Sequence, residues 1–325
     1  MVSSVKQTED VCTTAIPYQM SLEEARVVIR NIRAHIKQYF HENNLTYAVF
    51  GKSEGLDSSV IAALLNDIEG VKPIGVIMPC ESDIEAERIA RIVLDHYRIP
   101  WMRLDLTREY HALMGHLFSS EGVHGQLPAI LKHYGDTALL KSLPHRKPRA
   151  SGNIKARLRM ITLYHIAQLT GGIVVSTDNI SELFMGFWTL NGDVGDLSPI
   201  QYVLKGLEEY TIAEALGVPK ESVEAVPTDG LDVVPGGTDQ DQLGLPYQDL
   251  DRVIISLLQN KFDSGKTGED ETVALSHKLS EQLGYDSVKI LHVARQMQKT
   301  HYKRNWPRVF SRKEMGLPEI EDIKV

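Results

Sequence analysis

Hydrophobic residues in the first third of the chain recur with the periods of helices and strands in alternation. At 21–43 the apolar side chains repeat every three or four residues, which predicts an amphipathic helix. Beyond it, three apolar runs that predict strands are separated by two segments of helical period. These strands and helices are expected at 46–50, 58–67, 72–78, 83–97 and 101–104.

The same alternation resumes later, with a helix expected at 153–169 and a strand at 173–176. A polar, Gly- and Asp-rich stretch at 186–199 predicts a loop, and a helix at 204–217 follows it. Helical patterns at 250–258, 271–283 and 287–299 complete the chain. The pattern predicts a doubly wound α/β fold, a parallel sheet with helices on both faces and extra C-terminal helices.

Two segments interrupt this pattern. The first, 108–150, has helical patches followed by a turn-rich basic run at 144–149, and we interpret it as a partly exposed insertion. The second, 227–246, is rich in Gly, Pro and Asp and has almost no periodicity, which predicts a mobile loop. The expected organisation is a flexible tail at 1–20, a single domain at 21–305 and a C-terminal tail at 306–325.

Composition narrows the class of protein. The 325 residues are 42% hydrophobic and 24% charged, as in an ordinary globular protein. The net charge of -8 argues against general nucleic-acid binding, which needs a basic surface. Two cysteines without CxxC spacing, Cys12 and Cys80, fit a reducing compartment, so a cytoplasmic location is expected. No apolar stretch approaches the roughly 18 to 20 residues of a membrane span.

The strand at 46–50 runs into a short Gly/Ser turn that a helix follows at once. Unpaired N–H groups at the start of such a helix, together with its dipole, bind phosphate well. Ser53 and Ser58 add hydroxyl donors, and Asp57 supplies a hard oxygen that could hold Mg²⁺. The turn therefore predicts a phosphate site; an ordinary strand–turn–helix with serine caps is the alternative.

A second polar block, 176–182, directly follows the strand expected at 173–176. In a doubly wound sheet, ligands bind at the carboxyl ends of the strands. This block and the turn at 53–59 are therefore expected to face one crevice. Upstream, Asn153 and Arg157 are four residues apart and share a helix face.

These blocks belong to a series of short motifs in a fixed order. The motifs are 53–58, 152–157, 177–182, 186–187, 192–193, Asp196, Pro199, Lys205 and 227–231. The first resembles the PP-loop, Ser-Gly-Gly-x-Asp-Ser, of the ATP pyrophosphatases, and the whole set resembles NAD synthetase over about residues 45 to 305. Because no nitrilase-like glutaminase domain precedes the motifs, the ammonia-dependent form is expected.

The resemblance implies a reaction in which deamido-NAD (nicotinate adenine dinucleotide), ATP and ammonia give NAD, AMP and pyrophosphate. It implies Mg²⁺ as cofactor, held by Asp57 and Glu182, and a homodimer. It also implies catalytic roles for Asp57, Glu182 and Lys205. ATP contacts are implied for Gly51, Lys52, Ser53, Glu54, Gly55, Leu56, Asp57, Ser58, Thr177, Lys205 and Thr228. Contacts to deamido-NAD are implied for Asn153, Arg157, Asp196 and Lys303.

The chain departs from the family pattern at three places. Glu54 replaces a glycine of the PP-loop, Leu190 stands where a lysine usually touches deamido-NAD, and His301 is displaced by one position. Glu54 either points away from the phosphates, helps to bind the metal or impairs the site. Two rival functions stay open: another PP-loop ATP pyrophosphatase, amide-forming or sulfur-transferring, and a nucleotide-binding protein that has lost catalysis.

Overall fold

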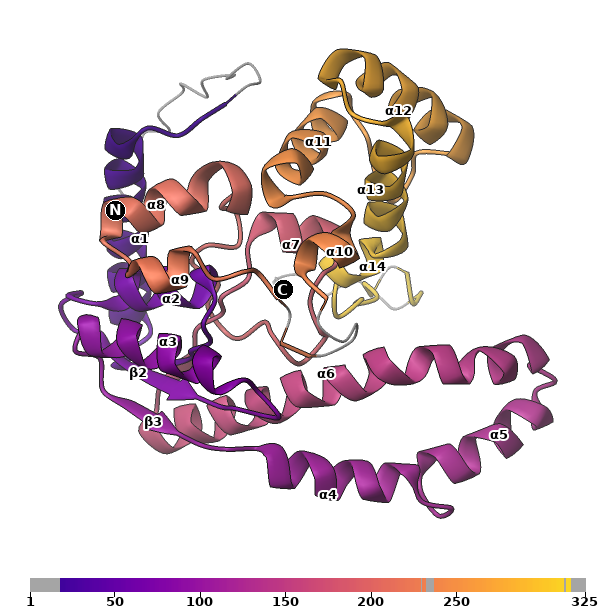
Figure 1. Cartoon of the computed structure of the whole chain (residues 1–325), viewed down its shortest axis with the longest axis horizontal. Helices are drawn as coiled ribbons and strands as arrows, with labels where there is room; N and C mark the ends of the chain where they lie inside the picture. Colours follow the sequence, from indigo (N-terminus) through magenta and orange to yellow (C-terminus); the bar gives the residue numbers. More distant parts are fainter. Residues whose placement is uncertain (1–17, 229, 232–236, 313, 317–325) are drawn as a thin grey trace.

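Four parallel strands form the sheet in the described part of the chain, in the order β3-β2-β1-β4 (Figure 1). The computed structural model describes residues 18–228, 230–231, 237–312 and 314–316, so most of the expected N-terminal tail and the end of the C-terminal tail lie outside it. The strands are β1 Tyr47–Gly51, β2 Lys72–Ile77, β3 Trp101–Arg103 and β4 Ile173–Val174. All four strand predictions are confirmed.

Both faces of the sheet are covered by helices, as the apolar pattern predicts. β1 pairs with β2 on one side and β4 on the other, so its middle residues have no exposed face. Val49 packs with Met160 and Leu163 of α6 (Thr137–Thr170) on one face. Phe50, on the opposite face, packs in a cluster formed by helices at 22–42, 56–65, 84–96 and 210–216. The doubly wound α/β prediction is confirmed.

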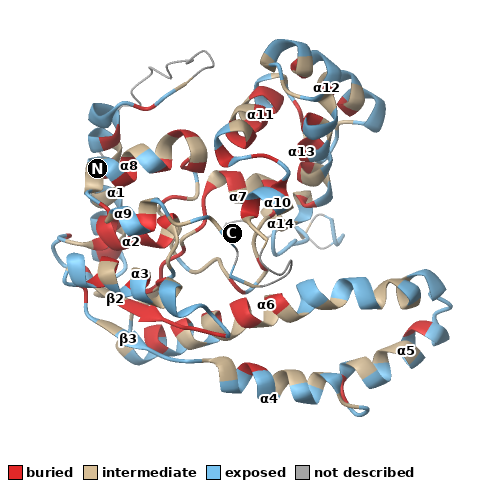
Figure 2. Cartoon of the chain, in the orientation of Figure 1, coloured by how far each residue is buried: buried red, intermediate tan, exposed pale blue. Residues whose placement is uncertain are grey.

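Figure 2 shows the buried residues gathered where these helices meet the sheet and, separately, between the C-terminal helices. The helices of the first cluster are α1 Leu22–Glu42, α2 Leu56–Leu65, α3 Ile84–His96, α8 Tyr210–Leu216 and α9 Lys220–Val223. Helix α7 Ile180–Met185 packs instead against the C-terminal helices. A π-helical turn, η1 Lys205–Glu209, precedes α8. The C-terminal helices are α11 Tyr247–Gln259, α12 Glu269–Leu283, α13 Ser287–Lys299 and α14 His301–Arg304.

The expected insertion forms a helical arm, residues 107–150, that projects from the sheet (Figure 1). It consists of α4 Thr107–Phe118, α5 Val123–His133 and the first part of α6, against which α4 and α5 pack. The prediction of a turn-rich run at 144–149 is wrong, because α6 begins at Thr137 and continues through Pro144 and Pro148. Both prolines lie on exposed turns, where water can serve the carbonyls that lose their N–H partners.

The interpretation of 227–246 as a loop without regular structure is also wrong in part. A short helix, α10 Asp239–Leu243, begins at Thr238, whose side chain forms a capping box with Asp241. The Thr-x-x-Asp spacing resembles the usual capping signal and was present in the sequence. Residues 229 and 232–236 lie outside the described residues, and mobility of the segment stays a prediction.

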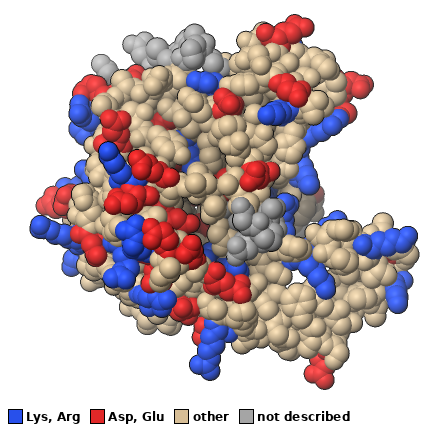
Figure 3. All heavy atoms as spheres, viewed as in Figure 1, with Lys and Arg blue, Asp and Glu red and all other residues tan. Residues whose placement is uncertain are grey.

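Charge is unevenly distributed between the arm and the rest of the molecule. The chain carries -8 overall, whereas residues 107–150 contain six Lys or Arg against three Asp or Glu. Figure 3 shows Lys and Arg at the outer end of the arm and many Asp and Glu on the α/β body. An anionic ligand on the body must therefore be bound by local cations. Among the described residues, no helix is long and apolar enough to cross a membrane.

Candidate active site

A pocket of about 730 Å³ opens at the carboxyl ends of β1 and β4. The turn after β1, the block after β4, the segment around α10 and the end of α13 all contribute to its wall. The two polar blocks thus share one crevice, as the strand order requires. The predicted site residues on the wall are Gly51, Lys52, Ser53, Glu54, Gly55, Leu56, Asp57, Ser58, Asn153, Thr177, Glu182, Lys205, Thr228 and Lys303.

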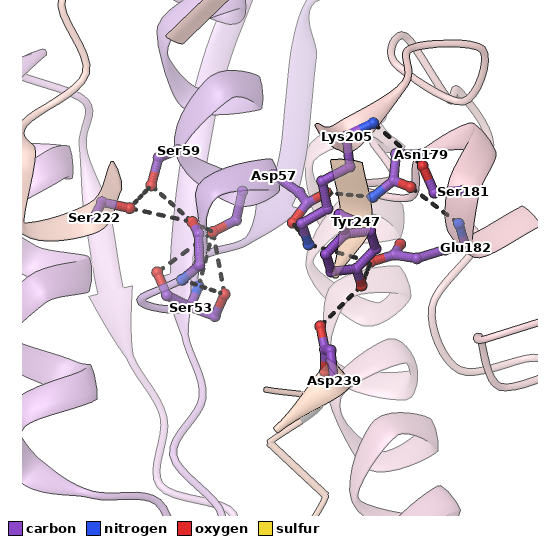
Figure 4. Close-up of polar contacts among 12 residues, drawn as sticks. Ser53, Asp57, Ser59, Asn179, Ser181, Glu182, Lys205, Ser222, Asp239 and Tyr247 are labelled. Carbon is purple, nitrogen blue, oxygen red and sulfur yellow. Dashed lines mark hydrogen bonds and ion pairs between the residues drawn. The ribbon is translucent and has the colours of Figure 1, made fainter. Parts of the chain in front are cut away.

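The turn between β1 and α2 is held by side-chain hydrogen bonds rather than by a helix cap. Gly55 occupies the N-cap position and has no side chain that could cap the helix. The first N–H groups of α2 therefore donate to no N-cap side chain. Ser58 Oγ lies 3.2 Å from Ser53 Oγ, and Ser222 Oγ donates to the Glu54 carbonyl at 2.7 Å (Figure 4). These contacts fix a backbone that can present donors to phosphate.

Lys52 lies beneath this turn and is only 3% exposed. Its Nζ donates to Ser58 Oγ at 3.0 Å and to the carbonyl of Ser53. Burial lowers the pKa of Lys52 to about 7, although the charges of Glu54 and Asp57 act in the opposite direction. The turn therefore contains a buried amine that titrates near neutral pH.

Asp57, Lys205 and Glu182 meet at the centre of the site (Figure 4). Lys205 Nζ lies 2.7 Å from Asp57 Oδ2 and 3.4 Å from Glu182 Oε1, and it sits over the Tyr247 ring, 4.4 Å from the centroid. Asn179 Nδ2 donates to the other Asp57 oxygen at 2.6 Å. One buried ammonium thus bridges two carboxylates that come from different helices, α2 and α7.

The pKa values of Asp57 and Glu182 shift in opposite directions, because the single ammonium stabilises the ionised form of Asp57 more strongly. Burial opposes ionisation of Asp57, but the Lys205 charge and the hydrogen bonds from Lys205 and Asn179 hold its pKa below the ordinary value. Burial, followed by repulsion from Asp57, raises the pKa of Glu182 well above its usual range. Burial likewise opposes the charge of Lys205, but Asp57, Tyr247 and Glu182 raise its pKa well above normal. The Asp57–Lys205 pair is therefore the charged unit.

The donor set fits Mg²⁺ in company with phosphate. Mg²⁺ is usually bound by one or two carboxylates, with phosphate oxygens and water completing the octahedron. Asp57 and Glu182 provide such oxygens on the pocket wall. No group of three or more His, Cys, Asp or Glu is placed for a metal within the described residues. Lys205 bridges both carboxylates in this structure. A magnesium ion bound by Asp57 and Glu182 therefore has to share their oxygens with the Lys205 ammonium.

The sequence patterns did not identify three residues near this centre, Tyr247, Asp239 and Glu209. Tyr247 OH donates to Asp239 Oδ2 at 2.9 Å, and Asp239 belongs to the segment expected to be a loop. Glu209 has no exposed surface, and its carboxyl lies beside that of Asp57. Burial and then the charge of Asp57 raise the pKa of Glu209 well above its usual range. Helical periodicity in the sequence predicts which face of a helix is buried. It does not predict which buried acid lies near a lysine that is distant in the chain.

The residues assigned to deamido-NAD do not form one group. Asn153 and Lys303 line the pocket, with Asn153 Oδ1 accepting from Thr189 Oγ1 at 2.9 Å. Lys303 Nζ donates to the carbonyls of Gly186, at 2.6 Å, and Trp188. Burial lowers the pKa of Lys303 to about 8. Lys303 and Trp188 also line a neighbouring pocket of about 770 Å³.

Arg157 and Asp196, by contrast, are not part of the wall of either pocket. Arg157 Nε donates to the carbonyl of Leu190 at 3.2 Å. Asp196 accepts from Tyr164 OH at 3.0 Å and from the backbone N–H of Val174 at 2.9 Å. Both side chains therefore have structural partners, and their roles toward a substrate stay predictions.

The fold and the site define an α/β enzyme in which a phosphate-type turn and a buried carboxylate–lysine centre share one pocket. A model of the NAD synthase family matches residues 28–307, so the chain belongs to this family. It is therefore a ligase that forms NAD by amidation.

Relatives agree with this assignment, and solved structures agree with the fold. The chain is 35% identical to the NH(3)-dependent NAD(+) synthetase of Finegoldia magna over 68% of this chain and 80% of the relative. It is 32% identical to the enzyme of the same name from Thermoplasma volcanium, over 78% and 88%. Its fold is similar to the NH3-dependent NAD synthetase of Campylobacter jejuni in complex with the nitrate ion (TM-score 0.62, 20% identity, 90% of this chain and 100% of that one). It is also similar to the NMN synthetase of Francisella tularensis (TM-score 0.63, 23% identity, 88% and 96%).

Proposed function

We propose that this protein is an ammonia-dependent NAD synthetase that activates the carboxylate of deamido-NAD with ATP. The observation that carries the proposal is the meeting of the turn after β1 with the Asp57–Lys205–Glu182 centre in one pocket. Relatives of which this chain covers 80% or more are named NH(3)-dependent NAD(+) synthetase, which supports ammonia as the nitrogen donor.

In the first step a nicotinate oxygen attacks the α-phosphorus of ATP, and the bond to pyrophosphate breaks. The N–H groups at the start of α2 and the hydroxyls of Ser53 and Ser58 bind the leaving pyrophosphate. Asp57 and Glu182 would hold Mg²⁺, which would supply positive charge to neutralise the phosphates. Lys205 lies between these carboxylates and places a positive charge beside the same oxygens.

In the second step the nitrogen of ammonia attacks the activated carbonyl carbon, the bond to AMP breaks and a proton leaves the nitrogen. The adenylated acyl group is already reactive, so positioning and exclusion of water are the main tasks of the protein. Asn153 and Lys303 are proposed to bind deamido-NAD from the far side of the pocket. Arg157 and Asp196 are proposed to support this part of the site through their hydrogen bonds to the backbone of Leu190 and Val174.

Product analysis tests the proposal directly. Purified protein is incubated with ATP, Mg²⁺ and either deamido-NAD or nicotinate mononucleotide, with ammonium or with glutamine, and AMP and the amide product are quantified. AMP release that requires both deamido-NAD and ammonium supports the proposal. Release with another acceptor identifies a different ATP pyrophosphatase, and tight nucleotide binding without AMP identifies a nucleotide-binding protein.

We further propose a homodimer that uses the outer face of α6. Ile161, Tyr164 and Leu169 on this face are 67%, 41% and 74% exposed, and Tyr202 beside them is 78% exposed. Such an apolar surface is typical of a subunit interface. Light scattering after gel filtration should give twice the chain mass, and Leu169→Glu should give monomers; a monomeric wild type contradicts the proposal. A cytoplasmic location remains a prediction from the cysteine content.

A further inference from the structure

Ser222 is a buried residue of α9 that contacts the turn between β1 and α2 from outside the pocket. Its side chain has no exposed surface and is not part of the pocket wall, whereas Ser53, Glu54 and Gly55 line the pocket. Ser222 Oγ donates to the Glu54 carbonyl at 2.7 Å (Figure 4). The Glu54 carbonyl therefore points out of the pocket, toward α9.

A second buried hydroxyl lies beside that of Ser222. Ser59 Oγ lies 2.6 Å from Ser222 Oγ and 2.9 Å from the Gly55 carbonyl, and Ser59 has no exposed surface either. Two hydroxyls, one from α2 and one from α9, thus face two successive carbonyls of the turn. Hydrogen bonds that are linked in this way polarise and strengthen one another in a site that water does not reach.

The orientation of the peptide between Glu54 and Gly55 decides which of its groups a ligand meets. In a planar trans peptide the C=O and the N–H point in opposite directions. Because the Glu54 carbonyl is held toward α9, the Gly55 N–H points into the turn, where it donates to Ser53 Oγ at 3.2 Å. Glycine tolerates positive φ, so Gly55 would also admit the flipped peptide, which offers the carbonyl oxygen to the pocket. Phosphate is bound by an N–H and repelled by a carbonyl oxygen.

We propose that Ser222 is a positioning residue for ATP: its hydroxyl holds the 54–55 peptide in the orientation that offers an N–H, and not a carbonyl, to the phosphates. The inference rests on the proposed function for the identity of ATP. The segment 225–228 of the pocket wall begins two residues after α9 ends. Ser222 therefore also joins the turn after β1 to the segment that carries Thr228.

The test compares Ser222→Ala with Ser276→Ala. Ser276 is a matched control, because it is 1% exposed, donates to the Thr272 carbonyl at 2.8 Å within α12 and does not line the pocket. Isothermal titration calorimetry in the presence of Mg²⁺ measures the affinity for a non-hydrolysable ATP analogue, and competition against it measures the affinity for AMP, which lacks the β- and γ-phosphates. Steady-state kinetics give kcat and KM, and thermal unfolding gives Tm.

We expect Ser222→Ala to weaken binding of the ATP analogue and to lower kcat/KM for ATP by at least ~5-fold, the scale of one lost hydrogen bond, while AMP affinity and the KM for deamido-NAD stay within ~2-fold of wild type. Ser276→Ala should lower Tm without changing any of these ligand constants. Unchanged binding of the ATP analogue in Ser222→Ala, or an equal loss of affinity for AMP, would overturn the proposal.

A second variant keeps the test decisive if Ser222→Ala does not fold. Ser222→Cys then replaces it under the same criteria, because a thiol has a similar shape and is only a weak donor. Binding of the ATP analogue remains measurable if the wild type makes no NAD, so this proposal and the proposed function fail separately.

Discussion

Lys205 and Asp57 form a buried ion pair, with 2.7 Å between Nζ and Oδ2, although 148 residues separate them along the chain. The lysine is 4% exposed and the carboxylate 15%, so water screens the pair only weakly. Asn179, at the start of α7, holds the second Asp57 oxygen. The contact joins α2, α7 and η1 at the point where the phosphate-type turn enters its helix.

The first prediction concerns the two carboxylates of this centre. Asp57→Asn and Glu182→Gln should each lower kcat by at least ~100-fold, because each removes a charge that stabilises the transition state. Steady-state assays at saturating Mg²⁺ provide the measurement, and Asp270→Asn, on an exposed turn of α12, is the control. Near-wild-type turnover in either variant would refute the role of that carboxylate.

The second prediction concerns Glu54. A carboxylate about 4 Å from a phosphate charge would cost about 4 kcal/mol per pair at an effective dielectric near 20, before screening by Mg²⁺. We therefore expect the Glu54 side chain to avoid the phosphates or to contact the metal. Glu54→Gly should change kcat and ATP affinity by less than ~3-fold, the scale of an ordinary surface substitution.

Glu54→Gln separates charge from volume in the same assays. A loss of Mg²⁺ affinity in both variants would indicate that the carboxylate contacts the metal. A large gain in ATP affinity in Glu54→Gly would instead show that Glu54 blocks the pocket and would favour the impaired nucleotide binder.

The third prediction follows from the buried amine of Lys52. Its pKa of about 7 in the folded protein lies below the ~10.4 of an unfolded lysine. Between these values the unfolded chain binds a proton that the folded protein does not, so stability rises with pH across this window. Below pH 7 both states are protonated, and the cost of burying the ammonium is present in full.

Lys52→Met should therefore raise Tm most at pH 6.5 and progressively less toward pH 9.5. Thermal unfolding of both proteins over this range is the measurement, with Lys220→Met, at an exposed position, as control. A Tm difference that does not change with pH would contradict the assignment.

The fourth prediction concerns Asp196, which the family resemblance assigns to deamido-NAD. Its carboxylate accepts from Tyr164 OH and from the N–H of Val174 in β4. Asp196→Ala should lower the free energy of unfolding by ~1–3 kcal/mol, because both donors lose their acceptor. Tyr164→Phe removes one of these bonds and should cost less. Urea titrations measure both, and an Asp196→Ala protein of normal stability with a raised KM for deamido-NAD would support direct binding instead.

The fifth prediction concerns the segment around α10. Thr228, Asp239 and Leu243 line the pocket, so bound ATP and deamido-NAD should restrict local opening there. Amide exchange at 237–246 should slow when both ligands are added, while exchange in α12 should not change. Equal exchange with and without ligands would contradict this prediction.

Local patterns account for most of the expectations that were confirmed. The strand β2 and the helix α13 lie where continuous apolar runs and helical periodicity place them, because burial against a sheet selects those patterns. The prediction of turns at Pro144 and Pro148 was wrong, because both prolines lie inside α6. An exposed helix tolerates them, since water can bind the carbonyls that lose their N–H partners. It also overlooked α10, whose five residues are too short to show a period.

The sequence by itself determined the parallel sheet, the phosphate-type turn and the presence of Asp57, Glu182 and Lys205, because each depends on residues close together in the chain. Only the tertiary structure decided that one ammonium bridges both carboxylates, that Tyr247 lies beneath it and that the Glu209 carboxyl is buried beside Asp57. Those contacts join segments far apart in the chain, and the burial that shifts their pKa values exists only after the segments pack together.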